Sequence, residues 1–421
     1  MTQPWHGSSV VVMDKHIPHD DVVIIGAGIG GLTLALALRE RGIEATILER
    51  TAELREVGAA VGLAANAVRL LGRYGVNEAL SEVSFLPSDL IFRDGRSGSV
   101  LGRTAVGETY RERFGADFWG LHRADLQRVL SEAVGVERIH LSHNVISVQD
   151  EGDHVLLDLA DGSQRSAGIV VGADGARSIL RRWVVGHDDA IYSGRSGFRG
   201  IIPTEQLTEL PDPHAIQFWI GPTGHLLHYA MGGDGQDVNF LAVSRDPREW
   251  TADQWVVPVR DEEKFAPFVG WHPAVTQMLG AVEVTQRWAL MRRPPIPTWH
   301  RGRVVLLGDA AHALVPHHGQ GANQSIEDTW ALAEEIAGAD PADPTPAFEA
   351  YEVRRRHRTR AVQFASAQVA EVLHLPDGPE AQARNAAMEH PEFFEEKLTW
   401  IHAYDPTIDS GIRPGTRVLN P

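Results

Sequence analysis

The 421-residue chain contains no cysteine. This absence excludes disulfides, thiolate metal sites and thiol nucleophiles, and with them oxidoreductases that depend on a redox-active cysteine pair. Long apolar runs are also missing, because none reaches the roughly 18 residues that a membrane-spanning helix requires. The first 20 residues lack a basic start followed by an apolar core, so they do not resemble a signal peptide. We therefore expect a cytoplasmic protein with no membrane partner.

Positive charge is scarce as well. Lys and Arg number 39 against 56 Asp and Glu, and the formal net charge is −17. This balance argues against non-specific binding to nucleic acid, although a cleft with an opposing local field can still take a small anion. The 20 histidines show no His-x3-His or carboxylate spacing, so no metal site is expected. The length suffices for two or three structural units with sizeable cores.

The first informative motif, Gly26–Gly31, lies between an expected buried strand and an expected helix. Gly26, Gly28 and Gly31 permit a tight turn and let the backbone approach a pyrophosphate, whose charge the helix N-terminus favours. Glu49 follows the next strand, where a carboxylate can accept hydrogen bonds from ribose hydroxyls. This βαβ unit predicts dinucleotide binding but does not distinguish NAD from FAD. The alternative is a purely structural glycine turn.

A second motif occupies Arg303–Asp328, about 280 residues further along the chain. A buried-strand pattern at Val304–Leu307 ends at Gly308, and the stretch Ser325–Asp328 fits the start of a helix. Asp309 stands at the strand-to-helix turn, where an acid beside backbone amides can hold a ribityl or phosphate group. Each motif alone is a weak signal. Together they predict one large cofactor held by distant parts of the chain.

Two other turns offer candidate cofactor contacts. Arg123, at the start of an amphipathic helix, fits a phosphate partner or a surface arginine in an ion pair. Asp174 lies in Gly172–Ser178, which is either a second cofactor-facing turn or an ordinary loop between a strand and a helix. The residues alone favour neither interpretation.

Three further residues are candidates for chemistry. His225 and Tyr229 share one face of an expected strand, roughly 13 Å apart, so they can flank a ring-sized ligand but cannot bond to each other. The alternative is a half-buried aromatic pair that packs the sheet. His317 follows Pro316 in a loop, where the alternative is a solvent-exposed histidine.

The combination of motifs is more specific than any one of them. The segments GAGIGG…ER (Gly26–Arg50), GADGARS (Gly172–Ser178) and GDAAHALVPHHGQGANQSIED (Gly308–Asp328) stand in this order, with HRADL (His122–Leu126) between the first two. This arrangement resembles the class A, single-component flavoprotein aromatic hydroxylases of the p-hydroxybenzoate hydroxylase fold. Within that family, the sequence is most similar to 3-hydroxybenzoate 6-hydroxylases, 6-hydroxynicotinate 3-monooxygenases and salicylate 1-hydroxylases.

The resemblance implies FAD as cofactor and NADH or NADPH as co-substrate. It also implies α/β architecture: a Rossmann-like FAD-binding domain, an inserted, mostly antiparallel substrate sheet and a C-terminal helical segment. The expected division is a flexible extension (1–20), a discontinuous FAD-binding domain (21–82, 110–190 and 287–345), a substrate-binding domain (83–109 and 191–286) and a C-terminal region (346–421). The implied FAD contacts are Gly26, Gly28, Gly31, Glu49, Arg50, Arg123, Asp174, Asp309, Gly321 and Ala322.

The resemblance also places His225, Tyr229 and His317 at the substrate. A base that titrates near neutrality suits removal of a phenolic proton, so we expect His225 or His317 as the base and Tyr229 as an orienting hydrogen bond. The sequence departs from the family at Ala60 and Ala65, where Gly and Pro are usual in a loop that approaches the flavin.

The expected reaction is hydroxylation of a monocyclic hydroxylated aromatic or N-heteroaromatic acid through a flavin hydroperoxide, with or without decarboxylation. The partners are then this acid, O2 and NAD(P)H, and the protein is a monomer or homodimer. The alternatives are an NAD-dependent dehydrogenase, a same-fold reductase or halogenase-like flavoprotein, and a non-catalytic flavin-binding protein. The Trp-x-Trp-x-Ile-Pro segment of halogenases is absent from the sequence.

Overall fold

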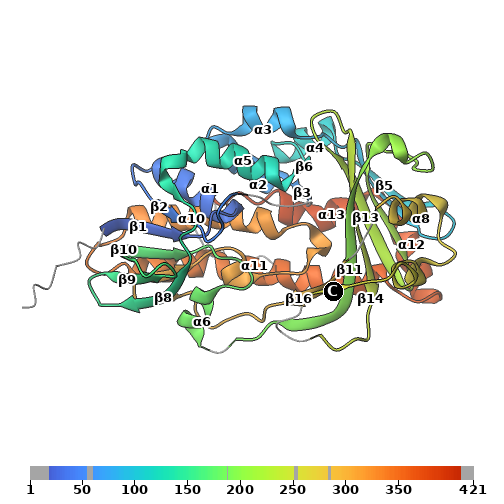
Figure 1. Cartoon of the computed structure of the whole chain (residues 1–421). Helices are drawn as coiled ribbons and strands as arrows, with labels where there is room; N and C mark the ends of the chain where they lie inside the picture. Colours follow the sequence, from blue (N-terminus) through green and yellow to red (C-terminus); the bar gives the residue numbers. More distant parts are fainter. Residues whose placement is uncertain (1–18, 55–59, 187, 251–254, 283–285, 409–421) are drawn as a thin grey trace, which may run out of the picture.

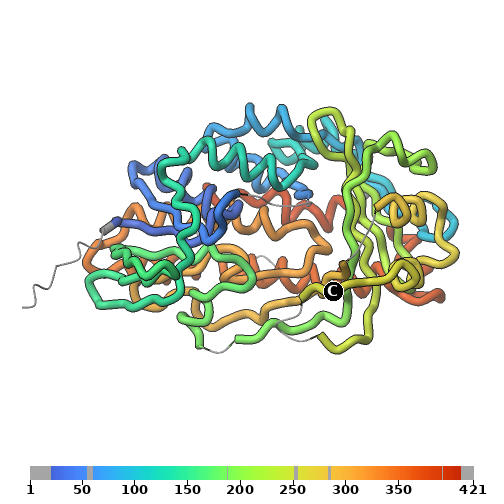
Figure 2. Tube along the Cα trace, in the orientation of Figure 1, coloured from blue at the N-terminus to red at the C-terminus, as the bar shows by residue number. Residues whose placement is uncertain are grey.

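The structure is a computed structural model that describes residues 19–54, 60–186, 188–250, 255–282 and 286–408. Within these residues, two eight-stranded sheets lie toward opposite ends of the molecule, with helices between them (Figure 1). The chain passes between the two ends more than once, as the tube in Figure 2 shows. Residues 1–18 of the expected extension lie outside the described part, whereas His19 and Asp20 already belong to the first strand.

The first sheet has a buried parallel core. Strands β7, β2, β1, β10 and β18 pair in parallel in this order, and their apolar side chains are buried, as in parallel sheets covered on both faces. Strand β17 pairs antiparallel with β18, and the hairpin β8–β9 continues from β10. The bounds are β1 His19–Ile25, β2 Thr46–Leu48, β7 Ile139–His140, β8 Val145–Asp150, β9 Val155–Leu159, β10 Gln164–Gly172, β17 His300–Arg301 and β18 Val304–Leu306.

Helices connect the strands of this sheet and pack on one another. Helix α1 contacts α5 and α10, and α10 contacts α2 and α11. Helix α10 begins four residues earlier than the start expected at Ser325, since the turn before it leads straight into helical backbone. The bounds are α1 Ile29–Arg39, α2 Ala65–Arg73, α3 Asn77–Val83, α4 Glu108–Phe114, α5 Arg123–Val134, α6 Ile179–Val185, α9 Asp309–His312 and α10 Gly321–Ala337.

The second sheet is antiparallel except where β4 and β12 run in parallel. Its order is β15-β16-β11-β14-β13-β12-β4-β5, which places β13 between β12 and β14. The inserted segment 191–286, expected to form a mostly antiparallel sheet, supplies β11 to β15. The bounds are β4 Asp89–Asp94, β5 Val100–Ala105, β11 Ile191–Pro203, β12 Ile216–Gly221, β13 Gly224–Met231, β14 Asp237–Arg245, β15 Val256–Pro258 and β16 Gln286–Arg292.

The remaining elements close the space between the sheets. A two-stranded ribbon, β3 (Ala60–Leu63) and β6 (Trp119–His122), contacts β13, and helices α7 (Asp261–Phe265) and α8 (Pro273–Gly280) lie beside the second sheet. The C-terminal part is helical, with α11 Thr345–Leu373, α12 Pro379–Met388 and α13 Pro391–His402. No helix in the described part of the chain is long and apolar enough to cross a bilayer.

Candidate active site

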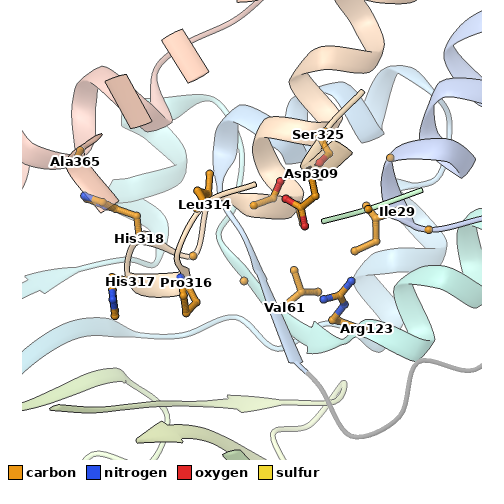
Figure 3. A pocket seen from close by; sticks show the side chains of 18 of the residues that line it. Ile29, Val61, Arg123, Asp309, Leu314, Pro316, His317, His318, Ser325 and Ala365 are labelled. Carbon is orange, nitrogen blue, oxygen red and sulfur yellow. Dashed lines mark hydrogen bonds between the residues drawn. The ribbon is translucent and has the colours of Figure 1, made fainter. Parts of the chain in front are cut away.

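A large cavity lies between the two sheets. Its volume is about 2580 Å³, well above the roughly 300–1,000 Å³ of a small-molecule pocket. The turns that follow β1, β2, β10 and β18 form one part of its wall, and β13, α10, α11 and α13 form others. Figure 3 shows part of this lining. The space suffices for a large cofactor and a smaller ligand side by side.

The glycine turn after β1 forms a cradle in the cavity wall. A Cβ on Gly26, whose φ is +108°, would lie 2.5 Å from the Ala173 carbonyl oxygen, and one on Gly31 would lie 2.0 Å from the Gly26 oxygen. Both positions therefore exclude a side chain. Gly28 also lines the cavity, but its Cβ would meet no atom within 4 Å. The open space above Gly28 is where a ligand can approach the backbone closely.

Glu49 lies directly after β2 and lines the same part of the cavity. Its Oε2 accepts a hydrogen bond from the Ala27 N–H at 2.9 Å, and its Oε1 accepts from the Thr51 N–H at 2.9 Å and hydroxyl at 3.0 Å. Glu49 thus fixes the glycine turn, and its remaining lone pairs can accept from ligand hydroxyls. Arg50 is exposed and lines the cavity mouth.

Asp309 and Arg123 face a common space in Figure 3. Asp309 is the first residue of α9 and keeps solvent access through the cavity. The surrounding protein nevertheless raises the pKa of this carboxyl by desolvation, an effect that His312 and Arg123 partly oppose. Hydrogen-bond donors, such as sugar-alcohol hydroxyls, stabilise the ionised form of a carboxyl that the protein partly desolvates.

The two carboxylate oxygens of Asp174 have different surroundings. Its Oδ2 accepts from the backbone N–H groups of Ile179, at 2.8 Å, and Leu180, at 3.3 Å, so it caps helix α6. Its Oδ1 is buried in the cavity wall without a hydrogen-bond partner among the described residues. Burial raises the pKa of this carboxyl. Both interpretations of the turn therefore have structural support.

The N-terminus of α10 faces the cavity, with Gly321 and Ala322 in its first turn. Asn323 ties this turn to ribbon β3: its Oδ1 accepts from the Ala64 N–H at 2.8 Å, and its Nδ2 donates to the Gly62 oxygen at 2.9 Å. The free N–H groups of the first helical turn favour negative charge in the cavity. No pattern in the sequence alone singles out Asn323.

The candidate histidines form a cluster with a third histidine that sequence reasoning missed. His317 lines the cavity, and its ring centroid lies 5.3 Å from that of His225. His225 is only 1 % exposed and is not among the described cavity-lining residues. Its Nδ1 lies 2.7 Å from Nε2 of His374, the residue that follows α11. Burial lowers the pKa of His225 and His317 well below the usual value, and that of His374 to about 3.

Tyr229 lines the cavity from β13 and is 8 % exposed. Burial raises the pKa of its hydroxyl, which therefore stays protonated at neutral pH. The wall around it is rich in aromatic side chains, and we call this region the aromatic lobe. These rings come from the second sheet, from the residue before β6, and from helices α4 and α13: Phe92, Tyr110, Phe118, Phe218, Tyr229, Trp288, Phe393, Phe394 and His402.

The chain belongs to the FAD binding domain family, whose model matches residues 19–365. It is 38 % identical over 384 residues to a 3-amino-4-hydroxybenzoate 2-monooxygenase of Streptomyces platensis, covering 91 % of this chain and 96 % of the relative. It is 32 % identical over 389 residues to a 3-hydroxybenzoate 6-hydroxylase of Aquipseudomonas alcaligenes, covering 91 % and 98 %. A solved salicylate hydroxylase substrate complex superimposes with a TM-score of 0.80 at 28 % identity, covering 95 % and 99 %.

The protein is therefore an FAD-dependent monooxygenase of the aromatic hydroxylase type, and the family resemblance expected from the motifs is confirmed. The family also confirms the expected cofactor, FAD, with NADH or NADPH as co-substrate. The dehydrogenase, reductase and halogenase-like alternatives are not favoured. The cavity fits FAD independently, since it offers the open cradle at Gly28, the Oδ1 of Asp174 without a partner among the described residues, and the cavity-facing carboxyl of Asp309.

Proposed function

We propose that this protein hydroxylates a monocyclic hydroxylated aromatic or N-heteroaromatic acid, with or without loss of CO2. The observation that carries the proposal is the aromatic lobe with Tyr229 and His317, which is continuous with the cradle at Gly28 in one cavity. Similar proteins are named for reactions on 3-amino-4-hydroxybenzoate and 3-hydroxybenzoate. In the proposed reaction, O2 and NAD(P)H with one proton convert a ring C–H into C–OH, and water and NAD(P)⁺ are released.

We assign the cofactor contacts as the sequence suggested. Gly26, Gly28 and Gly31 admit the pyrophosphate, and Glu49 holds the adenosine end. Arg50 and Arg123 are further FAD contacts, with Arg123 as a phosphate partner. Asp309 and Asp174 accept hydrogen bonds, and Gly321 and Ala322 contact the ring system. When bound, FAD supplies the redox and oxygen chemistry. The protein must bind the substrate ring, exclude water and remove the phenolic proton.

The geometry favours His317 over His225 as the base. A hydrogen bond between two neutral imidazoles needs one donor, and Nδ1 of His374 is buried without a partner among the described residues. The arrangement with the lowest cost leaves that Nδ1 unprotonated, so His374 donates from Nε2 to Nδ1 of His225. The lone pair of His225 is then occupied. His317, at the cavity wall beside it, is the histidine that can take a proton from substrate.

The two separate sheets support the domain division expected from the sequence except at the boundary after residue 286, because β16 (Gln286–Arg292) pairs with β11 and β15 in the second sheet. We retain the other boundaries as a proposal. The cytoplasmic location and the monomeric or homodimeric state also stay predictions.

A panel of aromatic acids tests the proposed function. The FAD-loaded protein should consume NAD(P)H faster when one of the hydroxylated benzoates, aminohydroxybenzoates or hydroxynicotinates is added. Mass spectrometry should then find a product heavier by one oxygen atom, or the same product without CO2. Oxidation of NAD(P)H that yields only hydrogen peroxide with every acid would contradict the proposal.

Replacing Gly28 with valine should weaken FAD binding at least about 10-fold, a cost of about 1.4 kcal/mol. The new side chain meets no protein atom near its Cβ and needs no unusual backbone, so the protein should fold while the cradle is filled. FAD affinity is measured by titrating apoprotein and following flavin fluorescence. Gly338→Val is the matched control, since this exposed glycine follows α10 outside the cavity. Equal FAD affinity in both variants would reject the assignment.

A further inference from the structure

Besides Tyr229 and His317, the substrate region contains a second pair of polar side chains, Tyr110 on α4 and His402 at the end of α13. The Tyr110 hydroxyl lies 2.9 Å from Nδ1 of His402 and accepts a hydrogen bond from the Ala65 N–H at 3.1 Å. Tyr110 is 4 % exposed and His402 6 % exposed, and both line the cavity. Tyr110 belongs to the same buried cluster as Tyr229. This pair therefore faces the lobe in which we place the substrate.

The contact with Ala65 requires a residue that has a backbone N–H at this position. Proline has no N–H and would place a ring carbon where Tyr110 now bonds. Ala65 is the first residue of α2, a position at which the helix itself does not use the N–H. The alanine thus leaves a buried donor, and the Tyr110 hydroxyl satisfies it.

This contact determines which proton His402 carries. In the described part of the chain, the hydroxyl of Tyr110 has two partners, the Ala65 N–H and Nδ1 of His402. The hydroxyl oxygen accepts from Ala65, and its hydrogen finds a protein acceptor only if it is donated to Nδ1. The opposite arrangement, in which Nδ1–H donates to the same oxygen, leaves the hydroxyl hydrogen without a protein acceptor among the described residues, so we take the first. His402 must then carry its proton on Nε2. That nitrogen has no hydrogen-bond partner among the described residues and is not one of the fully enclosed polar atoms.

The charges and burial around His402 determine which ligand groups its Nε2–H can bind. Burial lowers the pKa of His402 to about 3, so the ring is neutral at physiological pH. His318, Arg358 and Arg69 also disfavour a positive charge on the ring, and only Glu327 favours one. Burial penalises a charge of either sign, whereas the positive charges of Arg358 and Arg69 favour an electron-rich group beside the ring. A neutral N–H donor at this position therefore recognises an acceptor oxygen.

We propose that His402 binds the carboxylate of the aromatic acid through Nε2–H, and that Tyr110 and the Ala65 N–H are positioning groups that fix its tautomer. This inference rests on the proposed function, which places the hydroxyl-bearing end of the ring at His317 and Tyr229. The carboxylate is the other acceptor group of such a substrate. His402 therefore determines specificity for an acid over the same ring without its carboxylate.

The test compares 3-amino-4-hydroxybenzoate with 2-aminophenol, which is the same ring without the carboxylate. Each is titrated into FAD-loaded protein, and Kd is read from flavin fluorescence. In His402→Phe, binding of the acid should weaken roughly 10- to 100-fold, the loss expected for a hydrogen bond to a charged group. Binding of 2-aminophenol should change less than about 2-fold, because the lost partner is the carboxylate.

Further variants separate positioning from a packing defect. Tyr110→Phe and Ala65→Pro should each weaken binding of the acid alone, and their effects should not add in the double variant. His390→Phe, at the exposed start of α13 outside the cavity, is the matched control and should bind both ligands as the parent does. Equal weakening of both ligands in His402→Phe would overturn the inference and leave the proposed function standing. A parent protein that binds neither this acid, 3-hydroxybenzoate nor salicylate would overturn both.

Discussion

Replacing Arg355 with methionine is expected to lower the free energy of unfolding by about 3–5 kcal/mol. Arg355 on α11 is 0 % exposed, and its guanidinium lies 2.7 Å from both Asp328 Oδ1 and Glu327 Oε2 on α10. Both acids are 0 % exposed as well. Removing the cation leaves two carboxylates buried with less compensation, although Arg358 still contacts Glu327 and His312 still contacts Asp328.

The same change should also weaken FAD binding, because Asp328 supports the turn that carries Asp309. Its Oδ2 accepts from the Gly308 N–H at 3.2 Å and lies 2.5 Å from His312 Nε2. Chemical denaturation of the FAD-free and FAD-loaded forms measures the two effects. Arg96→Met is the control, since the Arg96–Asp377 pair is exposed and should contribute less than about 1 kcal/mol. A loss of similar size in both variants would contradict the expectation.

The pH dependence of this destabilisation follows from the acids. Burial alone would raise the pKa of Glu327 and of Asp328, but the charges of Arg358 and Arg355 on the first, and of His312 and Arg355 on the second, leave both pKa values lowered. Acids with a lowered pKa in the folded state stabilise it above their unfolded pKa, about 4, and this contribution is lost as pH falls through the folded value. The difference between parent and Arg355→Met should therefore shrink in acid.

The sequence predicted those parts of the site that depend on neighbouring residues. The strand, the turn at Gly26–Gly31 and the helix after it are local patterns, and the structure has all three elements in place. Local reasoning also left alternatives open at Asp174, where one oxygen caps α6 and the other faces the cavity. Spacing alone could not decide between two roles that one side chain performs with different atoms.

The parts that sequence reasoning missed depend on packing between distant segments. His374 and His225 are 149 residues apart in sequence, and Tyr110 and His402 are 292 apart. His374 follows α11 and His402 ends α13, and in such helices the sequence alone does not distinguish a polar residue that faces a cavity from one that faces solvent. The only local signal was the unusual Ala65, whose significance depends on where Tyr110 lies. The C-terminal helical segment, to which the sequence assigned no site residue, thus supplies part of the aromatic lobe.

Replacing His317 with alanine should lower kcat roughly 100- to 10,000-fold, the range for loss of a general base, while FAD stays bound. Burial lowers the pKa of His317, so its imidazole is neutral and has a lone pair for a proton at neutral pH, but it is a weaker base than the near-neutral histidine expected from the sequence. The deficit should shrink as pH rises toward the substrate's own phenolic pKa, about 10 for an unperturbed phenol, because the substrate then arrives deprotonated. His318→Ala, in the same turn, is the control: a much smaller fall in kcat in this variant would assign the effect to His317. Rapid-mixing measurement of hydroxylated product across pH decides the matter: a deficit that does not change with pH would assign His317 to positioning of the ring and not to proton transfer.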